Sequence, residues 1–179
     1  NLRLGGGRTH LVELLSVVDF DKHNIGKIIL WGSEETLALV EDRDRIEKRS
    51  PKEVSGNILS RTFWQTYQLS SLLEKAGVDI LFSPGGTYWG GFKPSVTMSR
   101  NMHPFEWREL RRFGFSTRTL KGIIQFFAQG FSYKRTQGLI FLTNYAKSSV
   151  LRSIGDISGH TTMIPHGVSQ RFKIEPKPQ

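Results

Sequence analysis

The 179-residue chain contains no cysteine, which excludes a disulfide framework and a metal site built on thiolates. It also has no run of the ~20 apolar residues that a membrane-spanning helix requires. Acidic residues are few, 16 against 25 basic ones, and the formal charge is +9. A charge of this size attracts nucleic acid, an anionic membrane surface or phosphorylated small molecules.

Hydrophobic content of 37% and charged content of 23% are typical of a folded globular domain. The first four residues, 1–4, are interpreted as the tail of a truncated strand, and no segment has the pattern of a signal peptide. These features favour a cytoplasmic protein, with peripheral attachment to a membrane as an addition that the charge allows.

Short apolar runs alternate with segments of helical periodicity along the chain. The runs predict strands at 27–31, 79–83, 94–99, 139–143 and 161–164, and a weak strand around 45–47. Helices are predicted after the glycines at 5–7 and over 34–40, 57–75, 104–112, 118–133 and 145–154. Apolar strands separated by helices predict an α/β fold with a mainly parallel sheet covered on both faces.

In such sheets ligands bind beyond the carboxyl ends of the strands. Gly5, Gly6 and Gly7 are followed by Arg8 between the strand stub and a helix. Consecutive glycines let backbone amides approach an anion, and a helix N-terminus favours negative charge. The alternative is a tight strand-to-helix turn with no ligand.

A second loop, 83–91, follows the strand at 79–83 and contains Gly85 and Gly86 beside two aromatic residues. The rings offer flat faces on which a sugar could stack. The competing interpretation is a surface loop that these rings anchor.

Four polar side chains follow the strand at 94–99: Arg100, Asn101, His103 and Glu106. Arginine can clamp a phosphate or carboxylate with two hydrogen bonds, and histidine can carry a proton near neutral pH. We take Arg100, Asn101 and His103 as candidate catalytic residues and Glu106 as a substrate-binding one. Structural roles for each remain open: Asn101 as a turn cap and His103 as a loop histidine. No metal is expected, because His10, His23 and His160 have no partner at metal-ligand spacing.

The last motif reads I-P-H-G-V-S-Q-R-F over 164–172 and contains His166 and Gly167, which we count among the substrate-binding candidates. The polar, proline-rich segment 173–179 after it has the composition of a linker.

Four ordered stretches resemble the acceptor-side domain of group 1 retaining glycosyltransferases with the GT-B fold. They are the glycine loop, D-I-L-F-S-P-G-G, R-N-M-H-P-F-E-W and I-P-H-G-V-S-Q-R-F. Relatives carry a His-Asp pair in the slots that Arg100 and Asn101 occupy here, so the family histidine is absent from its position.

The resemblance implies a Rossmann-like three-layer sandwich over 1–172, one half of a GT-B fold, followed by the start of an interdomain linker at 173–179. It implies sugar transfer with retention from a nucleotide-sugar to a hydroxyl of a saccharide or lipid-linked acceptor, with no cofactor. The donor domain would lie beyond Gln179, so this domain alone is expected to be inactive.

The segment 118–135 mixes basic and aromatic residues, which suits core packing or a membrane interface. We therefore keep the hypothesis that it faces anionic lipid or a lipid-linked acceptor, together with Arg108, Arg111 and Arg112. Two rival functions remain: a nucleic-acid-binding α/β module, although no common nucleic-acid motif occurs, and a nucleotide-sugar epimerase of GT-B architecture.

Overall fold

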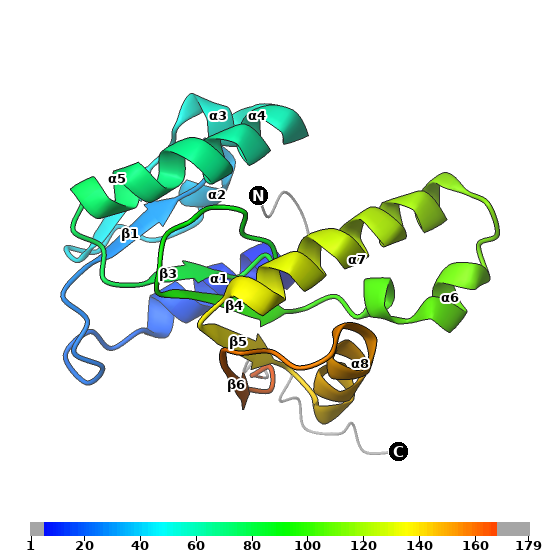
Figure 1. The fold of residues 1–179 in the computed structure, drawn as a ribbon. Coiled ribbons are helices and arrows are strands. Elements are labelled where there is room, and N and C mark those ends of the chain that lie inside the picture. The colour runs from blue at the N-terminus through cyan, green and yellow to red at the C-terminus, as the bar shows by residue number, and fades with distance from the viewer. Residues whose placement is uncertain (1–5, 168–179) are drawn as a thin grey trace, which may run out of the picture.

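The computed structural model describes residues 6–167 and has an α/β fold with parallel sheets (Figure 1). Strands β1 (Ile28–Trp31) and β2 (Ile46–Arg49) form one pair. The other sheet has four strands in chain order: β3 (Leu81–Ser83), β4 (Ser95–Ser99), β5 (Gly138–Phe141) and β6 (His160–Met163). Every strand pairing is parallel, as the alternation of strands and helices predicted.

The helices connect these strands, and all except α3, which was not predicted, lie close to predicted positions. They are α1 (Gly6–Val17), α2 (Glu34–Leu37), α3 (Lys52–Ser55), α4 (Ile58–Phe63), α5 (Leu69–Lys75), α6 (Trp107–Arg111), α7 (Thr117–Arg135) and α8 (Asn144–Ile154). Side-chain caps begin three of them, because the polar side chains of Asn57, Ser116 and Thr143 accept hydrogen bonds from backbone amides of the first turn.

Three apolar clusters hold the helices on the sheets. Leu11 and Leu15 of α1 pack with Phe20, Val40 and Ile46 against the β1–β2 pair. Tyr133 of α7 and Val150 of α8 pack on Leu139 and Phe141 of β5. A third cluster contains Trp64, Leu69 and Leu73, and both Trp31 of β1 and Leu81 of β3 border it. This third cluster therefore packs against both sheets.

Strand β4 lies inside the larger sheet and yet carries hydroxyl side chains at buried positions. The Thr97 hydroxyl donates to the Ser83 carbonyl at 2.8 Å, and the Thr136 hydroxyl donates to the Ser95 carbonyl at 2.7 Å. Burying a hydroxyl is tolerated when it finds a partner. These bonds fix β4 against β3 and against the end of α7, and so position the loop after Ser99.

The predicted helix over 57–75 is interrupted by a π-helical turn, Trp64–Gln68, between α4 and α5. Helical periodicity over 57–75 predicts one face that contains Leu59, Phe63, Thr66, Ser70 and Leu73, and this prediction is wrong. Leu59 and Phe63 are 80% and 57% exposed, whereas Leu73 is fully buried. A π turn inserts a residue into the helical repeat, which rotates the side chains after it relative to those before it.

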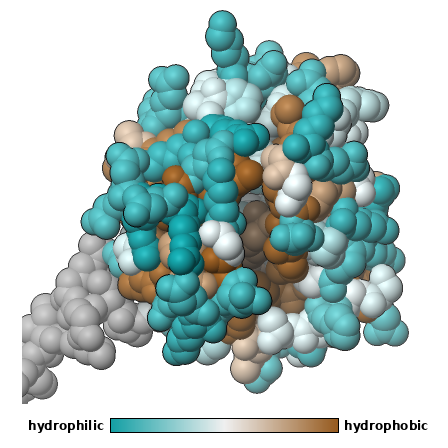
Figure 2. All heavy atoms as spheres, turned by 90° about the vertical axis from the view of Figure 1, so that its left-hand side faces the viewer, coloured by the Kyte–Doolittle hydropathy of each residue, from teal (hydrophilic) through white to brown (hydrophobic). Residues whose placement is uncertain are grey.

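The predicted boundaries at residues 1–4 and 168–179, including the linker at 173–179, lie outside the described residues. Among the described residues, no helix is long and apolar enough to cross a membrane. Strands β1 and β3 each have one hydrogen-bonded neighbour among the described strands. Figure 2 faces the side on which β1, β3 and α5 lie in Figure 1, and apolar side chains surround a hollow there.

Candidate functional site

A pocket of about 200 Å³ lies where the chain leaves the carboxyl ends of β3 and β4. The first turn of α1 and the second half of α7 complete its wall. Its lining consists of Gly7, Pro84, Gly85, Gly86, Arg100, Asn101, Gln129 and Tyr133. Five of these eight were candidates from the sequence, and they come from three separate motifs. The structure thus brings Gly7, Gly85, Gly86, Arg100 and Asn101 together.

Arg100 supplies the positive charge of the pocket and directly follows β4. Its Nε atom is buried and has no hydrogen-bond partner within residues 6–167. Burial lowers the pKa of its guanidinium below the usual value, because the charged form has lost solvent. An arginine so placed gains from an anionic ligand, which would supply both the counter-charge and the missing acceptor.

Gly86 lets the second loop approach the sheet closely. Its φ of +77° lies in the left-handed region, and a Cβ there would come within 3.3 Å of the Met98 carbonyl oxygen and of the Tyr133 hydroxyl. Gly85 is different, since a Cβ at that position would meet nothing within 4 Å. The loop therefore needs glycine at position 86 and tolerates a side chain at position 85.

Two of the lining residues, Gln129 and Tyr133, were not among the sequence candidates, and they lie one turn apart on α7. The buried Tyr133 hydroxyl donates to Gln129 Oε1 at 3.3 Å. Burial raises the pKa of Tyr133 to about 12, although the neighbouring Ser99 hydroxyl opposes the shift. The sequence offered one indication of these residues, a polar pair four positions apart on the otherwise apolar face of a helix. The pair was not recognised, because residues on such a face are expected to pack in the core.

His166 follows β6 and lies beside His10 of α1, with ring centroids 5.2 Å apart in an edge-to-face arrangement. Burial lowers the pKa of His10, and repulsion from His166 and Arg100 lowers it further. The contact between the two rings places the end of the described chain beside α1. From the sequence, His10 was expected to be structural or exposed.

Other predicted substrate-binding residues are less closely tied to the pocket. Gly6 begins α1, and Arg8 is half-buried in its first turn but does not line the pocket. Gly5 lies outside the described residues. Gly167 is exposed beside His166, and a Cβ on it would meet nothing within 4 Å.

Three residues of the R-N-M-H-P-F-E-W motif contact other residues of the protein. Asn101 Oδ1 accepts a hydrogen bond from the His103 amide at 3.1 Å, so the Asn101 side chain caps the turn as well as lining the pocket. The exposed His103 ring lies against Phe113, with centroids 5.7 Å apart. Glu106 accepts a hydrogen bond from the Tyr145 hydroxyl at 2.8 Å. Neither His103 nor Glu106 lines the pocket.

The aromatic residues of the 83–91 loop anchor it to helices. Tyr88 is buried, and its hydroxyl accepts a hydrogen bond from the Phe92 amide at 3.0 Å. Trp89 stacks on Phe131 of α7, with centroids 5.3 Å apart and an interplanar angle of 24°. Both rings are engaged with the protein itself, which agrees with the anchoring interpretation rather than with a platform for a sugar.

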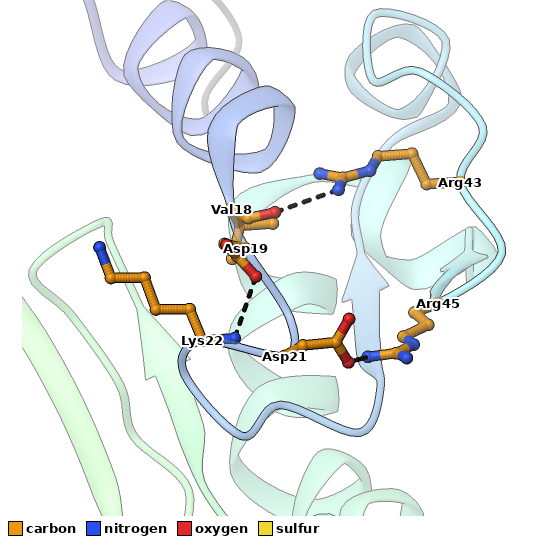
Figure 3. A network of polar contacts seen from close by, with 6 residues as sticks. All are labelled: Val18, Asp19, Asp21, Lys22, Arg43 and Arg45. Atoms are coloured by element: carbon orange, nitrogen blue, oxygen red, sulfur yellow. Dashed lines mark hydrogen bonds and ion pairs between the residues drawn. The ribbon is translucent and has the colours of Figure 1, made fainter.

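A second pocket lies at the opposite edge, near the start of β1 and β2, and its lining includes Asp21 and Arg45. The charged groups Asp21 and Arg45 of this pocket, and Arg43 near it, already have partners (Figure 3). Arg45 forms an ion pair with Asp21 at 2.7 Å, and Arg43 donates to the Val18 carbonyl at 3.1 Å. Because these cations are satisfied internally, the pocket around Arg100 is the stronger candidate for an anionic ligand.

No group of three or more histidine and acidic residues within 6–167 is placed to hold a metal ion. Comparisons of the chain with protein-family models, with curated proteins and with solved structures found no match.

Proposed function

We propose that this chain is the acceptor-side, Rossmann-like half of a retaining GT-B glycosyltransferase. It would bind a saccharide or lipid-linked acceptor, and a donor domain of the same protein would bring the nucleotide-sugar. The parallel sheets and the helices on their faces agree with this fold.

The observation that carries the proposal is the meeting of three motifs at one pocket. Gly7 of the glycine loop, Gly85 and Gly86 of D-I-L-F-S-P-G-G, and Arg100 and Asn101 of R-N-M-H-P-F-E-W are far apart in the sequence and line the same wall. Loops at the carboxyl edge of a parallel sheet are where ligands of α/β proteins bind. A pocket of about 200 Å³ is small for a nucleotide-sugar, which suits a site that a second domain completes.

Each group has a chemical role in this proposal. The backbone at the N-terminus of α1 favours the donor phosphates, since unpaired amides and the helix dipole attract anions. The Arg100 guanidinium, short of a partner, binds developing negative charge on the donor phosphate or orients the acceptor. His103 is turned to Phe113, so the orienting role falls on Arg100 and Asn101.

The test uses the full-length protein that contains this chain, supplied with nucleotide-sugars and hydroxyl acceptors. We expect an acceptor-dependent product in which the anomeric configuration of the sugar is retained, read by NMR. Arg100→Ala should lower turnover at least about tenfold, equivalent to ~1.4 kcal/mol in the barrier. Arg45→Ala at the opposite edge is the matched control and should keep wild-type kinetics.

Wild-type turnover for a folded Arg100→Ala enzyme would refute the role assigned to Arg100. A nucleotide-sugar product that forms without any acceptor would favour the epimerase instead. An affinity for oligonucleotides that falls steeply with salt, with no sugar transfer, would favour the nucleic-acid-binding module.

A further inference from the structure

Helix α7 carries an exposed apolar stripe on the part of the helix that extends away from the sheets (Figure 1). Leu120, Ile124 and Phe127 follow one another at spacings of four and three residues, and they are 60%, 60% and 66% exposed. Phe115 precedes the helix and is fully exposed. Apolar side chains at this spacing form one continuous face, and large exposed faces of this kind mark contact surfaces.

The part of the chain that carries this stripe is rich in basic residues and poor in acidic ones. Between Glu109 and Asp156 the sequence has no acidic residue, and it has eight basic ones: Arg111, Arg112, Arg118, Lys121, Lys134, Arg135, Lys147 and Arg152. Among the ion pairs of the described residues, only that of Arg112 with Glu109 involves this region. Arg118 lies over the Phe113 ring at 5.6 Å. Arg118 and Lys121 adjoin Leu120 on α7 and form no ion pair within the described residues. An apolar face with such cations beside it matches an anionic bilayer, whose surface supplies negative charge and whose interior accepts the rings.

We propose that this face, formed by Phe115 and the Leu120–Phe127 part of α7, docks on an anionic lipid bilayer. Resting on the proposed function, the inference specifies the acceptor as a lipid-linked saccharide. The helix connects the two sites, because Gln129 and Tyr133 line the pocket within two turns after Phe127. A headgroup presented at the membrane surface would then lie close to Arg100.

The charge argues for a bilayer rather than a second copy of the chain. A symmetric contact through this face would bring two cationic surfaces together, and like charges repel. The chain also offers an internal comparison, the stripe formed by Leu59 and Phe63 of α4 and Tyr67 of the π-helical turn after it, which together we call the α4 segment. These side chains are 57% to 80% exposed, but Arg61 is the one charged residue within 56–73. An exposed apolar stripe with a single cation beside it is therefore present on the same molecule.

The test is flotation of the chain with vesicles of phosphatidylcholine alone and with vesicles that also contain phosphatidylglycerol. We expect binding to the anionic vesicles and little to the neutral ones. The double variant Ile124→Glu, Phe127→Glu should lose at least about tenfold in binding, since it places charge in the apolar face. The control, Leu59→Glu with Tyr67→Glu, adds the same charge on the α4 segment and should bind normally. All four substituted side chains are exposed, and circular dichroism verifies the fold.

Equal binding to neutral and anionic vesicles would overturn the proposal, and so would normal binding by the α7 variant or loss of binding by the control. Kinetics of the full-length enzyme separate this inference from the proposed function. The α7 variant should keep transfer to a water-soluble acceptor and lose transfer to a lipid-linked acceptor in vesicles. Absence of any transfer by the wild type would refute the glycosyltransferase, while its vesicle binding would still test the docking face.

Discussion

Gly86 combines a left-handed backbone with a close approach to Met98 and Tyr133. We predict that Gly86→Ala lowers the free energy of unfolding by about 1 to 2 kcal/mol, because a Cβ is unfavourable at positive φ. Its neighbour Gly85 is exposed and open, so Gly85→Ala should change stability by less than about 0.5 kcal/mol. Urea denaturation of both variants measures the difference. Equal stabilities would contradict the conformation given to Gly86.

Tyr133 makes stability depend on pH in the alkaline range. Its pKa rises from 10.0 to about 12 on folding, so above pH 10 the unfolded chain releases this proton before the folded one does. The free energy of unfolding should therefore fall between pH 10 and pH 12, by up to about 3 kcal/mol from this group. Denaturation curves of wild type and Tyr133→Phe test the sign.

Between pH 10 and pH 12, the Tyr133→Phe variant should lose less free energy of unfolding than the wild type. The exposed Tyr67 supplies the control, and Tyr67→Phe should keep the wild-type slope. A Tyr133→Phe slope equal to that of the wild type would show that burial of Tyr133 does not govern the alkaline transition.

Single residues of the pocket were predictable where they come directly after a strand. Arg100 and Gly85 could be placed because parallel strands end at one edge, so the loops after β3 and β4 must meet there. Gln129 and Tyr133 could not, because they depend on how α7 crosses that edge. His103 was predicted from residue type alone, and a tilted contact with Phe113 determines where its ring lies.

The α6–α7 hairpin depends on a glycine inside a helix. A Cβ at Gly122 would overlap a methyl group of Leu110, which is 1% exposed. We predict that Gly122→Ala lowers the free energy of unfolding by about 1 to 2 kcal/mol, because overpacking outweighs the helix-forming gain of alanine. Lys121→Ala, at the exposed neighbouring position, is the control. Thermal unfolding of both compares them, and a more stable Gly122→Ala variant would contradict the packing of α6 on α7.

At the level of elements, most helices and strands could be predicted from apolar periodicity, with ends within a few residues. The π turn at Trp64–Gln68 could not, because an inserted residue leaves no mark in a pattern read at 3.6 residues per turn. Strand β4 was predicted as a run that begins at Pro94, although its buried hydroxyl residues Ser95 and Thr97 are not those of an apolar strand. Their hydrogen bonds to neighbouring segments compensate.

At the scale of the whole molecule, the composition predicts an attraction to anions, but it does not predict where the positive charge lies. The pocket places one cation, Arg100, at the carboxyl edge of the larger sheet, whereas the cations around Leu120–Phe127 lie along a protruding helix. Arg43 and Arg45 at the opposite edge are used in internal contacts. The basic residues are thus divided among the pocket, the exposed part of α7 and internal contacts.

The edges of β1 and β3 have a last consequence. The amides of Ile28 and Gly32 donate to β2 and its flank, so those of Ile29 and Trp31 point the other way. Each of these strands therefore has one edge with no hydrogen-bonded neighbour among the described strands, and such an edge is able to pair with a further extended segment. A strand added at either edge would extend that sheet on the side where Figure 2 shows the apolar recess.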